Sequence, residues 1–130
     1  MNYSPTISDH FHHPRNCGAM DRADAVGEAE NPVCLDRLRV YLRLDRASGT
    51  IAEATFQAEG CVPTLAVGSL LTELLRGKRP SELLPLTAED VERELGGLPA
   101  TKKHAAHLAV EALQAALAQI ISADGATKAD

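Results

Sequence analysis

The sequence has no tryptophan, and aromatic residues make up only 3% of it. A core without large rings must be built from Leu, Val and Ala. At 130 residues the chain has the length of one domain with a core of its own. We therefore expect a single domain over residues 1–130, with a partly flexible N-terminal segment at 1–33 and a frayed tail at 123–130.

Positive charge, long apolar runs and paired cysteines are also scarce. The net charge of −5 argues against a general nucleic-acid surface. Arg37, Arg39 and Arg43 are either a basic stripe or the solvated face of a sheet. The longest apolar segment, 105–123, is interrupted by polar residues, so we expect no membrane span. The cysteines number three, and no charged-then-apolar leader precedes them, so we expect reduced thiols in a cytoplasmic protein.

Two stretches of alternating apolar and polar residues lie at the centre of the chain. The alternation over 38–44 and again over 52–58 predicts two strands. Polar residues with one glycine join them, which predicts an antiparallel hairpin that turns near residues 47–48. Pairing the apolar faces sets even residues opposite even residues. This leaves Cys61 one place out of register, which a bulge at Gly60 corrects.

This hairpin predicts that reactive side chains meet at its open end. Cys34 precedes the first strand and Cys61 follows the second, at nearly equal distances from the turn, and Asp36 joins them. Pro63 suits the first turn of a helix that ends at Gly77. Cys61 therefore lies at a helix N-terminus, where the partial positive charge favours the thiolate. We expect Cys61 to be the more reactive cysteine and a ready metal ligand.

Periodicity and capping signals predict several helices. The predicted helical segments are 6–13, 63–76, 81–84, 87–95 and 101–122. Thr6 or Ser8 caps the first of them, and Thr87 opens a capping box for the fourth. Residues 15–31 lack periodicity and are expected to form a long connection.

Some polar residues before the hairpin have two interpretations. His10, His12 and His13 are either a metal cluster or exposed histidines near a chain end. Because His12 and His13 are neighbours, they face different directions on a helix. Cys17, in the long connection, is either a free thiol or reaches the site if that connection folds over.

The start of the last predicted helix is unusual. Lys102 and Lys103 occupy its first turn, where the macrodipole disfavours cations. They either serve a neighbouring anionic site or are ordinary solvated lysines. His107 follows His104 by one helical turn and is either a substitute ligand or a core or surface residue.

Short motifs fall in order along nearly the whole chain, from Tyr3 to Leu117. They are Tyr3-Ser4, Asp9-His10, Pro14-Arg15-Asn16 with Gly18, Cys34-x-Asp36, Gly60-Cys61 followed by Ala66 and Ser69, Leu98-Pro99, Lys102 and His104. With these motifs at these spacings, the chain resembles the IscU/NifU-type iron–sulfur cluster assembly scaffold family.

The resemblance implies an α+β domain, in which a small antiparallel sheet of three strands has helices packed on one face. It implies that Cys34, Asp36, Cys61 and His104 form the site of a labile [2Fe-2S] cluster, with Lys102 nearby. Two thiolates, a carboxylate and an imidazole are also an acceptable tetrahedral set for Zn²⁺ or Fe²⁺. Cys61 or Cys34 accepts persulfide sulfur from a cysteine desulfurase, and the cluster passes to iron–sulfur acceptor proteins.

The chain departs from the family at a few positions. Ala105 stands where the family has a third cysteine directly after the histidine, Leu35 replaces a glycine, and residues 62–63 replace small residues. A dedicated chaperone recognises the segment Leu-Pro-Pro-Val-Lys in some members. Here residues 98–102 read Leu-Pro-Ala-Thr-Lys, which argues against a chaperone partner.

Three functions follow from these residues. The first is a scaffold-like protein of iron–sulfur assembly. The second is a zinc-containing sulfurtransferase partner of a desulfurase, in which Asp36 and the thiols hold the metal and one thiol leaves to accept sulfur. The third is an adaptor that keeps the fold without cluster chemistry. We expect a scaffold or sulfur acceptor rather than an enzyme.

Overall fold

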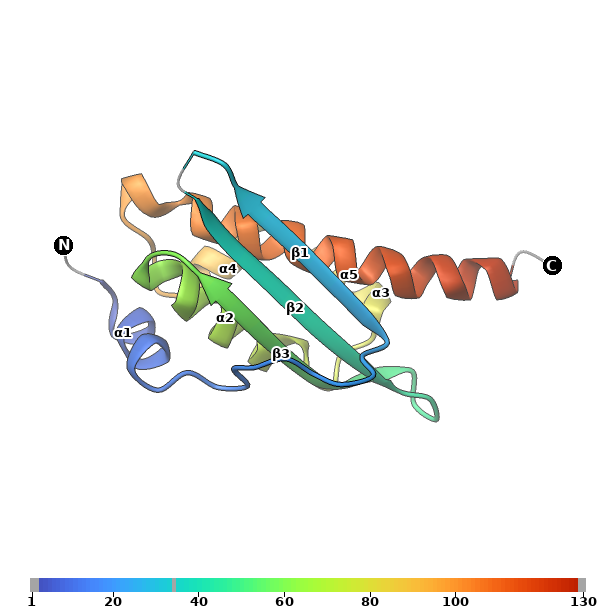
Figure 1. Cartoon of the computed structure of the whole chain (residues 1–130). Coiled ribbons are helices and arrows are strands. Elements are labelled where there is room, and N and C mark those ends of the chain that lie inside the picture. Colours follow the sequence, from blue (N-terminus) through green and yellow to red (C-terminus); the bar gives the residue numbers. More distant parts are fainter. Residues whose placement is uncertain (1–2, 34, 129–130) are drawn as a thin grey trace.

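The computed structural model describes residues 3–33 and 35–128, and within them three strands and several helices (Figure 1). The elements are α1 (Pro5–His12), β1 (Ala25–Asn31), β2 (Asp36–Asp45), β3 (Thr50–Glu59), α2 (Val62–Leu75), α3 (Pro80–Leu83), α4 (Ala88–Glu94), the 3₁₀ helix η1 (Ala100–Lys102) and α5 (His104–Lys128). The strands form one antiparallel sheet in the order β1-β2-β3, and α2 and α5 lie against one face of it (Figure 1). The predicted α+β fold is confirmed.

Strands β2 and β3 form the predicted hairpin. Val40 pairs with Phe56, so even residues face even residues, as the apolar faces require. The register shifts between residues 43 and 44, beside the turn. The bulge predicted at Gly60 is therefore wrong, because Gly60 follows the end of β3. The shift beside the turn lets the odd-numbered Ile51 join the core with its even-numbered neighbours.

Strand β1 was not predicted from its own residues. The connection expected over 15–31 is wrong for its second half, which pairs with β2. Ala25, Gly27 and Ala29 face the core in alternation with exposed residues, but they are too small to give a clear apolar period. A Cβ on Gly27 would lie 2.0 Å from the carbonyl O of Ala112, so glycine lets α5 approach β1 closely.

The core lies between the sheet and the two helices on its covered face. As the composition predicts, it is mostly aliphatic, and the largest fully buried residues are Phe56, Ile7, Leu38, Leu42, Ile51, Leu71, Leu75, Leu95, Leu113, Leu117, Val40 and Val67. A Cβ on Gly68 would lie 2.3 Å from a ring carbon of Phe56. This glycine therefore sets how closely α2 packs on β3.

The other face of the sheet is polar and exposed. Three arginines of β2 alternate along it and meet glutamates of both neighbouring strands. The ion pairs are Arg37–Glu30 at 3.2 Å, Arg39–Glu28 at 2.6 Å and Arg43–Glu53 at 2.5 Å. The arginines belong to a solvated face whose charges are balanced by glutamates, which is the second of the two interpretations given above.

Helix α1 has a different cap from the ones predicted. Ser4, not Thr6 or Ser8, accepts a first-turn backbone N–H at 3.1 Å. Pro5 then occupies the first helical position, where the missing N–H is not needed. The Ser4 hydroxyl also donates a hydrogen bond to the carbonyl O of Leu95, which ties the start of α1 to the end of α4.

The histidines of the N-terminal segment differ in their surroundings. His12 and His13 are exposed as expected, but His10 is only 5% exposed. Its Nδ1 lies 2.8 Å from Oγ of Ser69 on α2, and its Nε2 lies 3.5 Å from Glu73. The prediction of an exposed His10 is wrong because its partner comes from a distant part of the sequence. Among the described residues the three histidines form no metal-binding group.

A short 3₁₀ helix precedes α5 and moves the two lysines out of that helix. Lys102 ends η1, and α5 begins at His104, so the predicted start at residue 101 is wrong. Lys103 pairs with Glu92 at 2.6 Å. Helix α5 continues to Lys128, past the predicted end at residue 122. Among the described residues, no helix is both long enough and apolar enough to cross a membrane.

Both edges of the sheet have partners outside the sheet, in the second half of β3 and near the start of β1. Along β3, the N–H of Gly18 donates to the carbonyl O of Phe56, and the N–H of Phe56 donates to the carbonyl O of Asn16. At the β1 edge, the side-chain amide of Gln119 accepts from the N–H of Val26 and donates to its carbonyl O. The segment before β1 and helix α5 thus each satisfy backbone groups of an outer strand.

Candidate metal site

Asp36 begins β2 at the open end of the hairpin and is buried. It is 3% exposed, and it packs against Gly60, the residue that follows β3. A Cβ on Gly60 would lie 2.4 Å from Oδ1 of Asp36, and the φ of Gly60 is +145°. Both facts require glycine at this position. The close contact with Gly60 places the Asp36 carboxylate beside the first turn of α2.

Cys61 and Thr64 reach this carboxylate from α2. Cys61 occupies the N-cap position, with extended backbone angles, and Val62 begins the helix. Sγ of Cys61 lies 3.6 Å from Oδ2 of Asp36 and 3.3 Å from Oγ1 of Thr64. Thr64 donates its hydroxyl proton to the same Oδ2 at 2.8 Å. A thiol and a hydroxyl from one helical turn thus meet one carboxylate oxygen.

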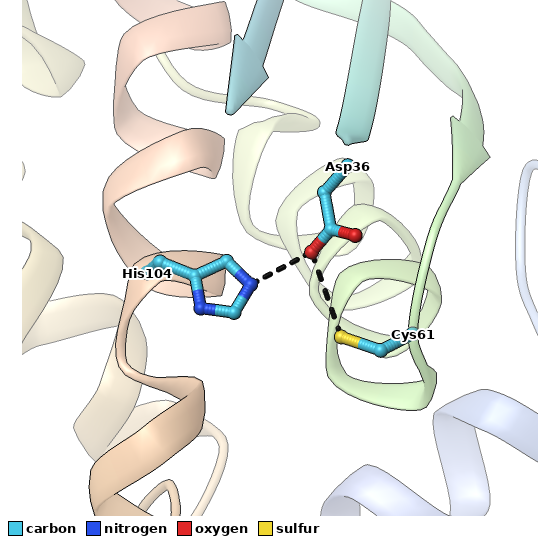
Figure 2. Close-up of side chains that lie close together, drawn as sticks. All are labelled: Asp36, Cys61 and His104. Atoms are coloured by element: carbon cyan, nitrogen blue, oxygen red, sulfur yellow. Dashed lines mark hydrogen bonds and ion pairs between the residues drawn. The ribbon is translucent and has the colours of Figure 1, made fainter. Parts of the chain in front are cut away.

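His104 approaches the same oxygen from the opposite side. It is the first residue of α5, and its Nε2 lies 2.7 Å from Oδ2 of Asp36 (Figure 2). A carboxylate can only accept hydrogen bonds, so Nε2 carries the proton. The His104 side chain is 18% exposed, compared with 5% for that of Asp36, so the group is partly open to solvent at the histidine.

The surroundings of Asp36 favour its ionised form. Burial raises the pKa of Asp36, but the hydrogen bonds from Thr64, His104 and Cys61 together outweigh burial and hold the pKa below its ordinary value. Asp36 is therefore a carboxylate at neutral pH, which is the form that binds cations.

The three side chains offer a mixed donor set for a metal ion. One carboxylate oxygen of Asp36, Sγ of Cys61 and a ring nitrogen of His104 all lie within 4.8 Å of one another. Among the side chains that the structure describes, in residues 3–33 and 35–121, no other group of three His, Cys, Asp or Glu meets this spacing. Sulfur, nitrogen and oxygen donors of these types suit zinc and ferrous iron. The chemistry of the donors therefore fits the predicted metals.

Two predicted residues are not in this group. Cys34, the fourth predicted ligand, lies outside the described residues. Cys17 precedes β1, in a segment that runs alongside β3. Its backbone forms an isolated parallel β-bridge with Phe56, and the residue is exposed. The described structure does not bring Cys17 into the cluster of Asp36, Cys61 and His104.

The residues around His104 have different environments. Lys102 lies two residues before it, at the end of η1, and is half-buried. His107 is exposed and lines a cavity of 230 Å³ together with His104, but it is not a member of the ligand group. Ala105 is fully buried.

Thr64 is the one member of the cluster that the sequence interpretation did not single out. It lies three residues after Cys61, and side chains at the N-cap and at the third helical position commonly meet. A helix that starts near Pro63 therefore predicts that the side chain of Thr64 lies beside that of Cys61. Its partner Asp36 could be identified only after the hairpin and the helix were combined.

This geometry agrees with the relationships of the chain to known proteins. The NifU-like N-terminal domain matches residues 2–125. The chain belongs to the NifU-like N-terminal domain family. The resemblance inferred from the sequence motifs is thereby confirmed.

Two relatives of similar length are named iron–sulfur cluster assembly scaffold proteins. The chain is 38% identical to the iron–sulfur cluster assembly scaffold protein IscU 1 of Archaeoglobus fulgidus, over 95% of this chain and 79% of that protein. It is 36% identical to the scaffold protein IscU of Aquifex aeolicus, over 95% and 78%. The nitrogen fixation protein NifU of Azotobacter chroococcum is also 38% identical, but the match covers only 38% of its length.

Two solved structures have the same fold as this chain. A proposed scaffold protein for the SUF system of Fervidobacterium islandicum has a TM-score of 0.71 at 22% identity, over 88% of this chain and 96% of that chain. The N-terminal part of a nitrogen-fixing NifU-like protein from Brucella abortus has a TM-score of 0.59 at 17% identity, over 95% and 82%. At these identities the likeness concerns the fold.

Proposed function

We propose that this protein is a scaffold-like protein of iron–sulfur cluster assembly. It binds Fe²⁺ or Zn²⁺, accepts sulfur from a cysteine desulfurase, holds a labile [2Fe-2S] cluster as cargo and passes that cargo to acceptor proteins. The observation that carries the proposal is the convergence of Asp36, Cys61 and His104 within 4.8 Å. The family and the names of the relatives support it.

Cys61 is the sulfur acceptor in this proposal. Its thiolate attacks the outer sulfur of the desulfurase persulfide, the S–S bond of the donor breaks, and the desulfurase cysteine leaves as a thiolate. The new S–S bond leaves a persulfide on Cys61, beside the donors Asp36 and His104. Cys34 is the second candidate acceptor and the fourth ligand. Lys102, near His104, is a cation for the anionic sulfur species.

A second candidate function is a zinc-containing sulfur acceptor that builds no cluster. It is favoured by Ala105, which stands directly after His104 where the family has a cysteine and therefore removes one thiolate. A single zinc ion is satisfied by a mixed set of sulfur, nitrogen and oxygen donors, whereas cluster irons prefer thiolates.

Anaerobic reconstitution separates the two functions. The purified protein is incubated with ferrous iron, cysteine and a cysteine desulfurase. A scaffold develops visible charge-transfer absorption, whereas a zinc-containing acceptor stays colourless, retains zinc and carries a persulfide on one cysteine in the mass spectrum. The variants Cys61→Ser and His104→Gln should lose the signal of either function. Cys17→Ser is the matched control, because Cys17 lies on the β3 edge outside the ligand group.

Failure of all these signals would leave only the adaptor function. A protein that takes up neither metal nor sulfane sulfur, or a Cys61→Ser variant that behaves like the wild type, contradicts the proposal. We place the reaction in a reducing compartment such as the cytoplasm, because the site depends on free thiols. We propose no chaperone partner, because residues 98–102 lack the motif.

A further inference from the structure

Thr64 belongs to the same cluster of polar side chains but is not one of the predicted metal ligands. It is 0% exposed and lies between the two side chains that α2 and β2 contribute. Its Oγ1 is 2.8 Å from Oδ2 of Asp36 and 3.3 Å from Sγ of Cys61. A buried hydroxyl in this position can hold the carboxylate of Asp36 in place beside Cys61.

The single hydroxyl proton of Thr64 fixes the direction of these hydrogen bonds. Because the Asp36 carboxylate can only accept, the Thr64 proton is directed to Oδ2. The thiol of Cys61 has a single proton, which it donates either to Oδ2 of Asp36 or to Oγ1 of Thr64. Thr64 therefore holds Asp36 by a hydrogen bond of its own and packs against Sγ of Cys61.

The three hydrogen bonds to Asp36 respond differently when a cation binds. His104 must give up its Nε2 proton before that nitrogen can bind a metal, and Cys61 binds as a thiolate without its proton. If Nε2 and Sγ were the ligand atoms, both of these hydrogen bonds to Oδ2 would be lost. The neutral hydroxyl of Thr64 keeps its proton, so its hydrogen bond to Asp36 is the one that persists in the loaded site.

Gly60 restricts the same carboxylate from the other side. Even a Cβ on Gly60 would lie 2.4 Å from Oδ1 of Asp36 and 2.7 Å from Cγ. The carboxylate is thus enclosed by the Gly60 backbone and by the Thr64 hydroxyl. Removing the hydroxyl opens one of these two restraints.

We propose that Thr64 is a positioning residue that holds Asp36, beside Cys61, in the orientation in which Asp36 binds the metal. The inference rests on the proposed metal-binding function of this site. Loss of a hydrogen-bonded partner behind a ligand typically lowers metal affinity by about 10–100-fold, and we expect a loss of that size in Thr64→Val.

The test compares three variants by anaerobic titration with Co²⁺ and by Zn²⁺ competition against a chromophoric chelator. Thr64→Val keeps the shape of the side chain without the hydroxyl, and Thr64→Ser restores the hydroxyl. Thr72→Val is the matched control, because Thr72 is also 0% exposed in α2 but donates to the carbonyl O of Ser69. Circular dichroism of each metal-free variant establishes that it is folded.

The expected result is specific to the hydroxyl at residue 64. Thr64→Val should bind Zn²⁺ about 10–100-fold more weakly and show an altered thiolate-to-cobalt absorption band. Thr64→Ser and Thr72→Val should match the wild type in affinity and spectrum. Wild-type affinity and spectrum in Thr64→Val overturn the inference and leave the proposed function intact.

Two other outcomes are also decisive. If Thr64→Val does not fold, the affinity of Thr64→Ser for Zn²⁺ is the deciding measurement. A folded Thr64→Ser variant that binds Zn²⁺ much more weakly than the wild type overturns the role of the hydroxyl. If the wild type binds neither cation, the proposed function and the inference both fail. The wild-type titration therefore distinguishes failure of the proposed function from failure of the inference.

Discussion

Leu35 adopts a left-handed backbone conformation immediately before Asp36. Its φ is +60°, and its side chain is 75% exposed. A non-glycine residue with a left-handed backbone conformation costs about 1–2 kcal/mol of stability. A new glycine costs roughly 0.4–1 kcal/mol, because it increases the conformational entropy of the unfolded chain. We predict that Leu35→Gly raises the free energy of unfolding by up to about 1 kcal/mol, measured by urea denaturation.

The exposed neighbour Val33 provides the control for this substitution. Val33 is 89% exposed and is not among the described residues with a positive φ. Val33→Gly therefore removes a similar apolar side chain without relieving strain, and it should leave stability unchanged or lower. Equal changes in the two variants would contradict the role assigned to the backbone of Leu35.

Ala105 is the residue at which this chain lacks the third cysteine of the family. We predict that Ala105→Cys raises the yield of reconstituted cluster, because it adds a thiolate beside His104. Visible absorption per protein after anaerobic reconstitution measures this yield. Ala109→Cys is the control, since Ala109 is also fully buried in α5 but one turn further along. No increase over wild type, or the same increase in both variants, would contradict our interpretation of Ala105.

Single residues of the site were predictable where local patterns combine. The strand alternation and the helix start together brought Asp36 and Cys61 to one end of the hairpin, and their contact is observed. The pairing of His10 with Ser69 could not be predicted, because the two residues are 59 positions apart and belong to different helices. Hydrogen bonds between distant elements leave no periodic signal in the sequence.

At the scale of elements, α1 and α2 are joined by a histidine that is neutral when buried. Burial lowers the pKa of His10, and the nearby Arg15 lowers it further, while Glu73 and Asp9 raise it by less. The pKa of His10 in the folded chain is therefore below the value of about 6.5 expected in the unfolded chain. As the pH falls through and below 6.5, the unfolded chain binds the proton first, so stability decreases.

We predict that His10→Gln reduces this loss of stability at acidic pH. The urea midpoint of the wild type should fall between pH 7.5 and pH 5.5, and that of His10→Gln should fall less, because glutamine does not titrate. His12→Gln is the control, since His12 lies in the same helix but is exposed. Identical pH profiles of His10→Gln and the wild type would contradict the titration of His10.

Elements were predictable when their side chains were large enough to show a period. The hairpin and α2 follow from strong apolar patterns. Strand β1 presents Ala25, Gly27 and Ala29 to the core, and these residues give little contrast with their neighbours. The 3₁₀ helix before His104 was also missed, because Lys102 and Lys103 carry no signal that separates a short turn from the first turn of a longer helix.

For the whole molecule, the candidate metal site joins three separate elements. Asp36 comes from β2, Cys61 precedes α2 and His104 begins α5. An ion that binds all three should stabilise the fold, by about 2.7 kcal/mol at a free concentration 100 times its dissociation constant. We predict that saturating Zn²⁺ raises the Tm of the wild type by several degrees and that a chelator reverses the increase.

The dependence on Cys61 tests whether this stabilisation arises at the site. Cys61→Ser should lose most of the increase in Tm caused by Zn²⁺, whereas Cys17→Ser should keep it, because Cys17 lies outside the ligand group. An increase that persists in Cys61→Ser would place the stabilising ion elsewhere.

The partners at the two sheet edges affect how other proteins can associate with this one. Asn16 and Gly18 bind the backbone of Phe56 in β3, and Gln119 binds the backbone of Val26 near the start of β1. An extended peptide that adds itself as a fourth strand would first have to displace these groups. Recognition through β-augmentation is thus disfavoured at Phe56 of β3 and at the start of β1, and the same two contacts protect these parts of the edges against edge-to-edge aggregation.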